Sequence, residues 1–181
     1  MKNIQIKTEI ITLIFIILCT VGVIFKDYIP YNVLTSTFIH SSKDHYINNI
    51  LLFLLLSPSV EEKFGKANYL SAFALTVVTV YCFHTYLLHV NGIGISAWIF
   101  ALIVLNIGKL KLSGIILIII YAFQEISGMF DNDNTSHAGH LLGIITGIIY
   151  LLIYNYISKK KETYEQEERS EKNIFSDLSR L

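Results

Sequence analysis

The chain has 181 residues, of which 53% are hydrophobic and only 15% are charged, and its formal net charge at pH 7 is zero. Soluble domains carry roughly 25% charged residues, so the composition argues against a soluble domain and predicts an all-α protein that crosses a membrane several times. No basic patch favours a nucleic-acid partner.

Six apolar segments follow one another along the chain, most of them near the roughly 17–25 residues that a spanning helix needs. They lie at about residues 10–25, 45–59, 69–90, 95–107, 112–127 and 137–157. The second is expected to end at Pro58 and the charged run after it. The second and fourth are short for a full span, so we expect their ends to be shielded by protein or by a water-filled cavity. The sequence thus predicts a six-helix membrane domain over residues 1–158, with a short buried fourth helix.

The placement of lysines predicts the orientation in the membrane. With a cytoplasmic N-terminus, the inner segments hold Lys2, Lys7, Lys63, Lys66, Lys109, Lys111 and Lys159–Lys161. The outer loops hold only Lys26 and Lys43, beside several aspartates. This asymmetry follows the positive-inside rule and places both termini in the cytoplasm. Residues 159–181 are charged and polar, and we expect a solvated cytoplasmic tail with a short helix near 170–181.

Polar side chains open the second segment. His45 and Asn49 are four residues apart, so they share one helical face near the outer membrane boundary. An imidazole N–H and an amide NH₂ are donors that can stabilise negative charge on a carbonyl oxygen during acyl transfer. Asn48 is the neighbouring alternative, but it points about 100° away from His45.

Ser96 begins the fourth segment directly after the glycine-containing turn Gly92-Ile93-Gly94. Glycines let the backbone approach a substrate or a neighbouring helix closely. A serine hydroxyl becomes a nucleophile only when a neighbouring base removes its proton. The alternative is that this serine serves only helix packing, as serines in membrane helices commonly do.

The sixth segment offers that base. His140, Gly143 and Gly147 lie on one helical face, and the glycines permit tight packing against another helix. Ala97 and Ala101 give the fourth segment a matching small surface. Close approach of the two helices would bring the imidazole within hydrogen-bond reach of the serine. The competing interpretation is glycine-mediated packing in which the histidine bonds to a neighbouring carbonyl.

Taken together, these motifs resemble the rhomboid intramembrane serine proteases over roughly Thr35 to Tyr150. The matching motifs, in order, are His40, His45 and Asn49; Val60-Glu61-Glu62-Lys63-Phe64-Gly65; Gly94-Ile95-Ser96; and His140, Gly143 and Gly147. The resemblance implies a hydrolase in the plasma membrane of a prokaryote that needs no cofactor or metal and cleaves transmembrane segments of other proteins near the outer leaflet.

The resemblance also implies roles for single residues. Ser96 and His140 would form a catalytic dyad with no acidic third member. His45, Asn49 and the backbone N–H of Ser96 would form the oxyanion hole. The structural support implied by the family pattern comes from His40 and Glu61, which hold the outer loop and the second helix, from Gly94, Gly143 and Gly147, and from Phe100, which packs against the catalytic imidazole.

The chain departs from the family pattern in three places. Ala97 stands where glycine is usual after the serine, and Tyr31-Asn32 stands where rhomboids often carry Trp-Arg, so packing of the first outer loop is in doubt. His137 competes with His140 for the role of base. Only His140 has glycines at both offsets, and we therefore favour it.

Two other functions compete with proteolysis. One is a catalytically inactive rhomboid-like module that binds or escorts membrane proteins, although such relatives typically lack the serine or the histidine. The other is metal binding or transport, prompted by six histidines, but the chain has no His-Glu-x-x-His arrangement. Glu125, near the outer end of the fifth segment, is expected to lie at the membrane interface rather than to act in catalysis.

Overall fold

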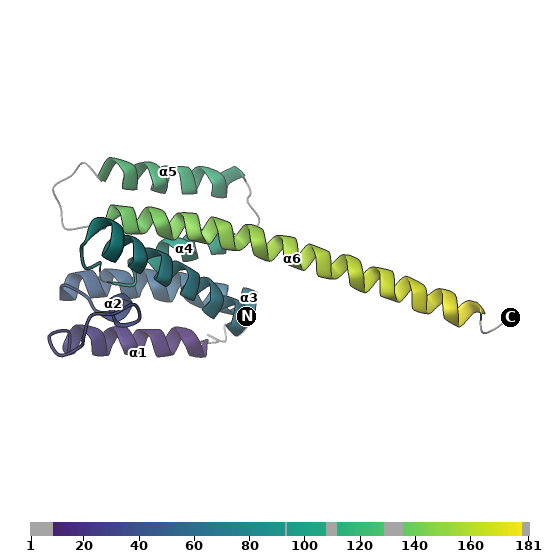
Figure 1. Ribbon diagram of the computed structural model, residues 1–181, viewed down its shortest axis with the longest axis horizontal. Helices are drawn as coiled ribbons and strands as arrows, with labels where there is room; N and C mark the ends of the chain where they lie inside the picture. Colours follow the sequence, from purple (N-terminus) through teal and green to yellow (C-terminus); the bar gives the residue numbers. More distant parts are fainter. Residues whose placement is uncertain (1–8, 93, 108–111, 129–135, 179–181) are drawn as a thin grey trace, which may run out of the picture. The chain divides into compact units, whose positions relative to one another are not determined.

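The computed structural model describes residues 9–92, 94–107, 112–128 and 136–178, and all regular structure in these ranges is helical (Figure 1). The elements are α1 (Ile10–Ile24), α2 (Thr35–Phe38), α3 (Lys43–Cys82), a π-helical continuation η1 (Phe83–Leu88), α4 (Ser96–Ile107), α5 (Leu112–Gly128) and α6 (His137–Leu178). The predicted all-α class is confirmed. The chain forms two compact units, residues 1–148 and 149–181; the predicted division into a membrane domain and a cytoplasmic tail near residue 158 stays a prediction.

Two helical stretches of the described residues are long and apolar enough to cross a membrane, Lys43–Leu88 and His137–Arg169. The helices Ile10–Ile24 and Ser96–Ile107 are apolar but shorter. Within the first stretch, Gly65 has non-helical dihedral angles, with φ 75° and ψ 160°. This left-handed conformation favours glycine and divides α3 into two helical runs, which match the second and third predicted segments.

The second segment does not end at Pro58 as expected. Pro58 lies inside α3, and the helix continues to the break at Gly65. Proline removes one hydrogen bond from a helix interior, but Val60, Glu61 and Phe64, which follow it, are all buried. Their tertiary contacts offset the lost bond, so the helix extends by another turn.

Glu61 fastens this turn to the first helix. Its Oε1 accepts from the Ile11 backbone N–H at 3.0 Å, and its Oε2 accepts from the Thr12 N–H and the Thr12 hydroxyl, both at 2.9 Å. The hydroxyls of Thr12, Ser57 and Tyr69 continue the network. The carboxylate therefore satisfies the free N–H groups at the start of α1.

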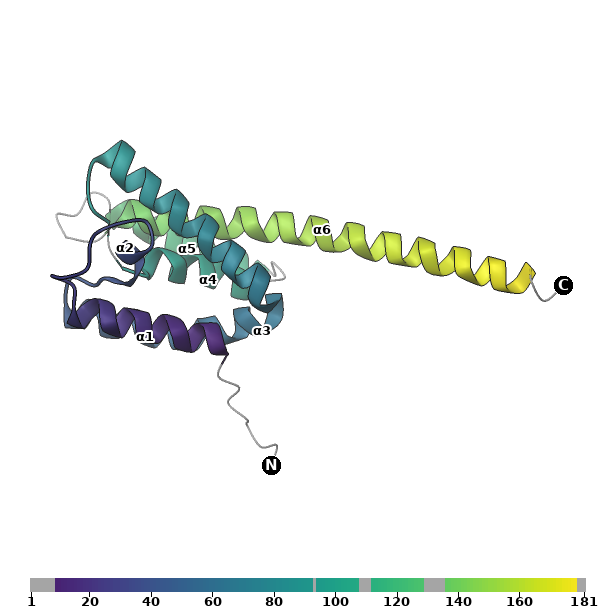
Figure 2. The ribbon, with the colours of Figure 1, turned by 60° about the horizontal axis from the view of Figure 1, so that its bottom comes forward.

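Helix α4 lies in the interior of the first unit in both ribbon views (Figures 1 and 2). Trp98, Ile99, Leu102 and Leu105 are each 1% exposed or less. The Trp98 indole N–H donates to the Tyr69 hydroxyl at 3.2 Å. A short, enclosed helix of this kind can present a polar residue at its N-terminus without exposing it to lipid.

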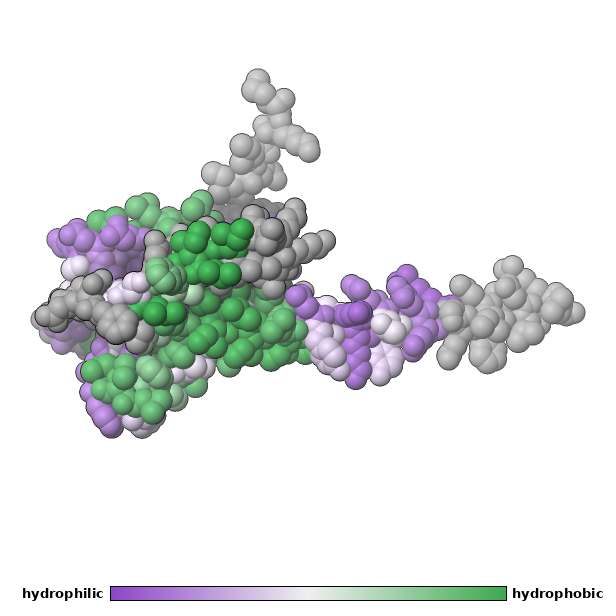
Figure 3. All heavy atoms as spheres, turned by 90° about the horizontal axis from the view of Figure 1, so that it is seen from above, coloured by the Kyte–Doolittle hydropathy of each residue, from purple (hydrophilic) through white to green (hydrophobic). Residues whose placement is uncertain are grey.

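Much of the described outer surface of the first unit is apolar. Large hydrophobic side chains are exposed on α1, α3 and α5, among them Ile17, Leu55 and Phe123. In Figure 3 the middle of this unit is mostly hydrophobic, and hydrophilic residues gather toward its left end. So many exposed apolar side chains suit a lipid environment rather than water.

The second unit is a continuous helix, where a polar tail with a short helix near 170–181 was expected. Helix α6 runs to Leu178, and its later residues are hydrophilic (Figure 3). No glycine or proline follows Gly147 to interrupt it. Oppositely charged pairs one turn apart, Lys161–Glu165 and Glu168–Lys172, add stability.

Candidate active site

Ser96 is the first residue of α4, and the preceding turn fixes its position. Gly94 has φ 105°, a conformation that glycine adopts without strain. The Gly94 N–H donates to the carbonyl of Ser36 at 2.9 Å, which ties the turn to α2. Ile95 is fully buried beside it. Ser96 itself is half-buried and lines a pocket together with His140.

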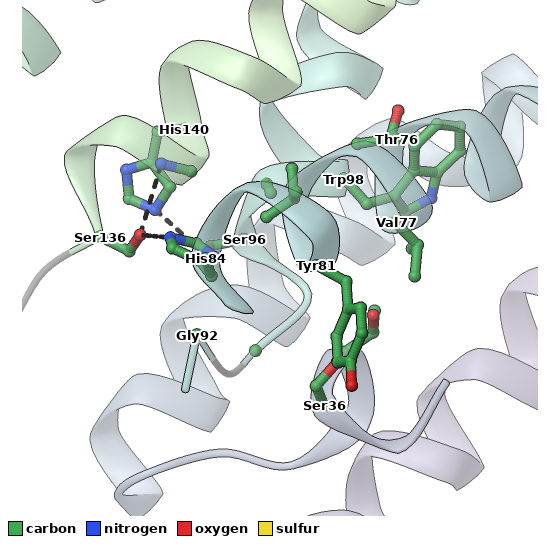
Figure 4. A pocket seen from close by; sticks show the side chains of 15 residues that line it. Ser36, Thr76, Val77, Tyr81, His84, Gly92, Ser96, Trp98, Ser136 and His140 are labelled. Carbon is green, nitrogen blue, oxygen red and sulfur yellow. Dashed lines mark hydrogen bonds between the residues drawn. The ribbon is translucent and has the colours of Figure 1, made fainter. Parts of the chain in front are cut away.

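His140 faces this serine from α6. Its Nε2 lies 2.9 Å from Ser96 Oγ, a hydrogen-bond distance (Figure 4). The Phe100 ring stacks on the imidazole, with centroids 4.3 Å apart and planes inclined by 17°. The juxtaposition predicted for Ser96 and His140 is therefore present, as is the aromatic neighbour.

The close approach of α4 and α6 depends on small residues. A Cβ atom on Gly143 would lie 2.1 Å from the carbonyl oxygen of Ala97, and one on Gly147 would lie 3.1 Å from the Cα of Ala101. No larger residue fits at Gly143 without moving a backbone, so the glycine face of α6 sets the depth at which His140 meets Ser96.

His45 and Asn49 lie against Gly94, in the turn before Ser96. A Cβ atom on Gly94 would lie 2.8 Å from His45 Cε1 and 3.6 Å from Asn49 Nδ2. Asn49 is 7% exposed, whereas the alternative, Asn48, is exposed. Among the described residues, no atom accepts a hydrogen bond from the buried Asn49 Nδ2. The site thus holds a buried donor with unused capacity.

His40 anchors the loop between α2 and α3. The ring is fully buried, and its Nδ1 lies 3.0 Å from the Phe38 carbonyl oxygen, to which the N–H donates. It packs edge-on against the rings of His45 and Tyr46. Burial lowers the pKa of His40 to about 4, so the ring is neutral at physiological pH.

Glu125 has partners that were not expected from the sequence. It is 9% exposed, and its Oε2 lies 2.9 Å from His140 Nδ1 and 2.6 Å from His137 Nδ1. Its predicted place at the membrane interface stays a prediction. The expected absence of an acidic group beside the dyad is therefore wrong for the geometry of this chain. The signal that could have revealed it is a carboxylate within an apolar segment, which is costly unless it is paired.

Two further polar residues at the pocket were not singled out as site residues from the sequence. His84, in η1, is 3% exposed, and its Nε2 lies 2.6 Å from Ser136 Oγ (Figure 4). Gly92 and Gly139 both lie against the His84 ring. His84 and Ser136 line the pocket together with Gly92 and Gly94.

Glu125, His137 and His140 each offer one ligand atom, and these atoms lie within 4.8 Å of one another, so they could hold a metal ion. The separations of 2.6 and 2.9 Å are those of direct N–H···O hydrogen bonds. The three side chains thus form hydrogen bonds with one another without an ion. The expectation of a metal-free site stays a prediction. Lys2, Lys7, Lys109, Lys111 and the outer-loop aspartates after Gly128 lie outside the described residues.

Comparison with known proteins agrees with the motifs. The family model of the rhomboid domain matches residues 27–157. A protein of Acanthamoeba polyphaga mimivirus, described as a "putative rhomboid protein", is 30% identical over 139 residues, which cover 68% of this chain and 74% of that protein. The match spans all the elements that build the pocket and confirms the resemblance noted in the sequence. The chain belongs to the rhomboid family of membrane proteins.

Proposed function

We propose that the chain is an intramembrane serine endopeptidase that cleaves transmembrane segments of other proteins with Ser96 as nucleophile and His140 as base. The observation that carries the proposal is the 2.9 Å separation between Ser96 Oγ and His140 Nε2 in a pocket that both residues line. Both groups come from apolar helices, where polar side chains persist mainly for function.

Acylation follows from this geometry. His140 Nε2 removes the Ser96 hydroxyl proton as Oγ attacks a peptide carbonyl carbon, and a tetrahedral oxyanion forms. The protonated imidazole then gives its proton to the departing amine, and the C–N bond breaks. The same imidazole then deprotonates a water molecule, which attacks the acyl-enzyme and forms a second tetrahedral intermediate. Collapse of this intermediate releases the carboxylic acid, and the imidazolium returns the proton to Ser96 Oγ.

The oxyanion is stabilised by donors around the turn at Gly94. The Ser96 backbone N–H lies at the N-terminus of α4, where the helix dipole favours negative charge. The unused amide donor of Asn49 lies against Gly94, two residues from Ser96, and the His45 ring lies beside it. A donor held ready before the oxyanion forms needs no reorganisation during the reaction.

The substrate and the location follow from the environment of the site. The pocket opens in a unit with an apolar exterior, so a single-span membrane protein can approach laterally through lipid. The lysine distribution supports an orientation with Ser96 and His140 near the outer leaflet and both termini in the cytoplasm. We propose cleavage near that leaflet.

The direct test is cleavage by the purified full chain in liposomes that contain a panel of single-span reporter proteins. The wild type is expected to release a shorter fragment of at least one reporter, and Ser96→Ala is expected to release none. Ser127→Ala, which changes an exposed serine of α5, is the matched control and should cleave normally. Cleavage that persists in Ser96→Ala would exclude this mechanism, and a chain that binds reporters without cleaving them would be the escort module.

A further inference from the structure

The carboxylate of Glu125 lies behind the imidazole of His140, on the side away from Ser96. Glu125 Oε2 is 2.9 Å from His140 Nδ1, while His140 Nε2 is 2.9 Å from Ser96 Oγ. The three side chains come from three helices, α5, α6 and α4. They form one line of hydrogen bonds from the hydroxyl to the carboxylate.

The chemistry of these groups decides which atom holds the ring proton. An ionised carboxylate has no proton and only accepts hydrogen bonds. The bond between Glu125 and His140 therefore requires the proton on Nδ1. A neutral imidazole with its proton on Nδ1 has its lone pair on Nε2, which is the nitrogen that faces Ser96. Glu125 thus selects the tautomer in which His140 can act as base.

A second donor holds the carboxylate in place. His137 Nδ1 lies 2.6 Å from the same oxygen, Oε2, and it reaches that oxygen from one helical turn before His140. The two imidazole rings are nearly perpendicular, with an interplanar angle of 82°. The pair of donors fixes the direction of the carboxylate, which is buried and therefore costly to leave unpaired.

We infer that Glu125 is a positioning residue for the reaction: it orients His140 through Nδ1 and stabilises the imidazolium that forms when Ser96 loses its proton. This inference rests on the proposed function and adds an acidic third member to the expected dyad. It also assigns to α5 a part in the chemistry, because this helix alone supplies the carboxylate. The simpler alternative is that Glu125 only ties α5 to α6, and the experiments separate the two.

The first experiment needs no substrate. The full chain is labelled with ¹⁵N-histidine in detergent micelles, and the ring protons are observed by NMR. A strongly downfield proton on His140 Nδ1, assigned by its absence in His140→Gln, is expected in the wild type and in Ser127→Ala. It is expected to disappear or move upfield in Glu125→Gln, which keeps the shape of the side chain but removes the charge. An unchanged resonance in Glu125→Gln overturns the inference, whatever the activity of the chain.

The second experiment measures rate per active site. Active sites are titrated with a fluorophosphonate, and kcat and KM for a cleaved reporter are measured for the wild type, Glu125→Gln and Glu125→Asp. Loss of orientation by Glu125→Gln is expected to lower kcat by about 10²-fold with little change in KM. Glu125→Asp, which restores the charge on a shorter arm, is expected to recover at least a tenth of the wild-type kcat.

The outcomes distinguish this inference from the proposed function. If the wild type neither cleaves nor reacts with the fluorophosphonate, the proposed function fails and the NMR result alone decides the position of Glu125. If the wild type cleaves and Glu125→Gln keeps its kcat per titrated site, Glu125 is only a tie between helices and the inference is overturned. An equal loss in the Gln and Asp variants also overturns it, since the charge then has no effect.

Discussion

Two buried polar clusters in the first unit differ in how completely their hydrogen bonds are used. In the Glu61 cluster, formed by Thr12, Ser57, Glu61 and Tyr69, both carboxylate oxygens accept from donors at the start of α1. In the Ser96 cluster, formed by Ser96, His140, Glu125, His45 and Asn49, the hydroxyl and imidazole bond to each other while a buried amide has no partner among the described residues. Buried polar groups are nearly always paired.

We interpret this difference as one of role: the polar groups of the Glu61 cluster stabilise the fold, and those of the Ser96 cluster serve the proposed reaction. A fully satisfied network stabilises the fold and has nothing left to offer a ligand. A buried donor without a hydrogen-bond partner destabilises the folded chain by about 1–3 kcal/mol. A hydrogen bond from this donor to an incoming oxyanion would remove that destabilisation. Substitutions in the Glu61 cluster should therefore change stability, and substitutions in the Ser96 cluster should change rate.

The largest effect is expected at His140. His140→Ala removes the base, and it is expected to lower kcat for reporter cleavage by about 10³-fold or more with little change in melting temperature. The control is His89→Asn, which changes an exposed histidine at a positive φ of 55° that asparagine tolerates. If His140→Ala cleaves at near the wild-type rate, the Ser96 cluster does not control the rate, and the proposed difference in role between the two clusters is wrong.

Asn49 is expected to have the next largest effect. Asn49→Ala removes the unused amide donor, so kcat should fall by about 10²–10³-fold. Stability should not fall in proportion, because the lost amide group has no hydrogen-bond partner among the residues that the structure describes. Asn48→Ala, one residue earlier and exposed, is the matched control. Equal effects of the two substitutions would argue against an oxyanion hole at this position.

Glu61 should behave in the opposite way. Glu61→Gln replaces an acceptor oxygen by an NH₂ group that faces N–H donors, and we expect the free energy of unfolding to fall by about 2–4 kcal/mol. The rate per titrated active site should be unchanged. Glu62→Gln, at the exposed neighbouring position, should alter stability by less than about 0.5 kcal/mol. Stability is measured by thermal unfolding in detergent. A Glu61→Gln protein with unchanged stability but an altered rate per active site would contradict this prediction.

The smallest effect is expected from the titration of His40. The pKa of His40 is lowered to about 4 in the folded chain, against 6.5 for an ordinary histidine. Unfolding therefore binds a proton between these values, so the contribution of the neutral ring is fully present above pH 6.5 and is lost as the pH falls toward 4. The loss is at most about 1.4 kcal/mol per pH unit.

This contribution is isolated by comparison with His40→Gln, which cannot titrate. Stability of both proteins is measured between pH 7 and pH 5, and the wild type should lose more stability than the variant over that range. Parallel curves would show that His40 is not buried as neutral imidazole, and the anchoring of the loop between α2 and α3 would need another explanation.

Local spacing made most of the site predictable. Residues three, four and seven apart share a helical face, so the grouping of His45 with Asn49 and of His140 with Gly143 and Gly147 followed from the sequence. Small residues on both helices indicated the close contact of α4 and α6. These are short-range properties of a helix, and they survive folding because a helix is geometrically regular.

Features that depend on tertiary contacts were harder to predict. Pro58 suggested the end of a helix, because proline is disfavoured in a helix interior. In the structure the helix continues past Pro58, and Glu61, which follows it, is buried. Glu125 suggested the membrane interface because it lies near the outer end of the predicted fifth segment. Its partners, His137 and His140, come from the next helix, and no spacing within α5 indicates them.

If Ser96 is a nucleophile activated by His140, a fluorophosphonate should attach covalently to Ser96. The wild-type chain in liposomes is treated with the reagent and digested, and the adduct is located by mass spectrometry. We expect one adduct, on Ser96, that is lost in His140→Ala and kept in Ser127→Ala. An adduct on another serine, or no adduct from a chain that cleaves its reporter, would contradict the proposed role of Ser96.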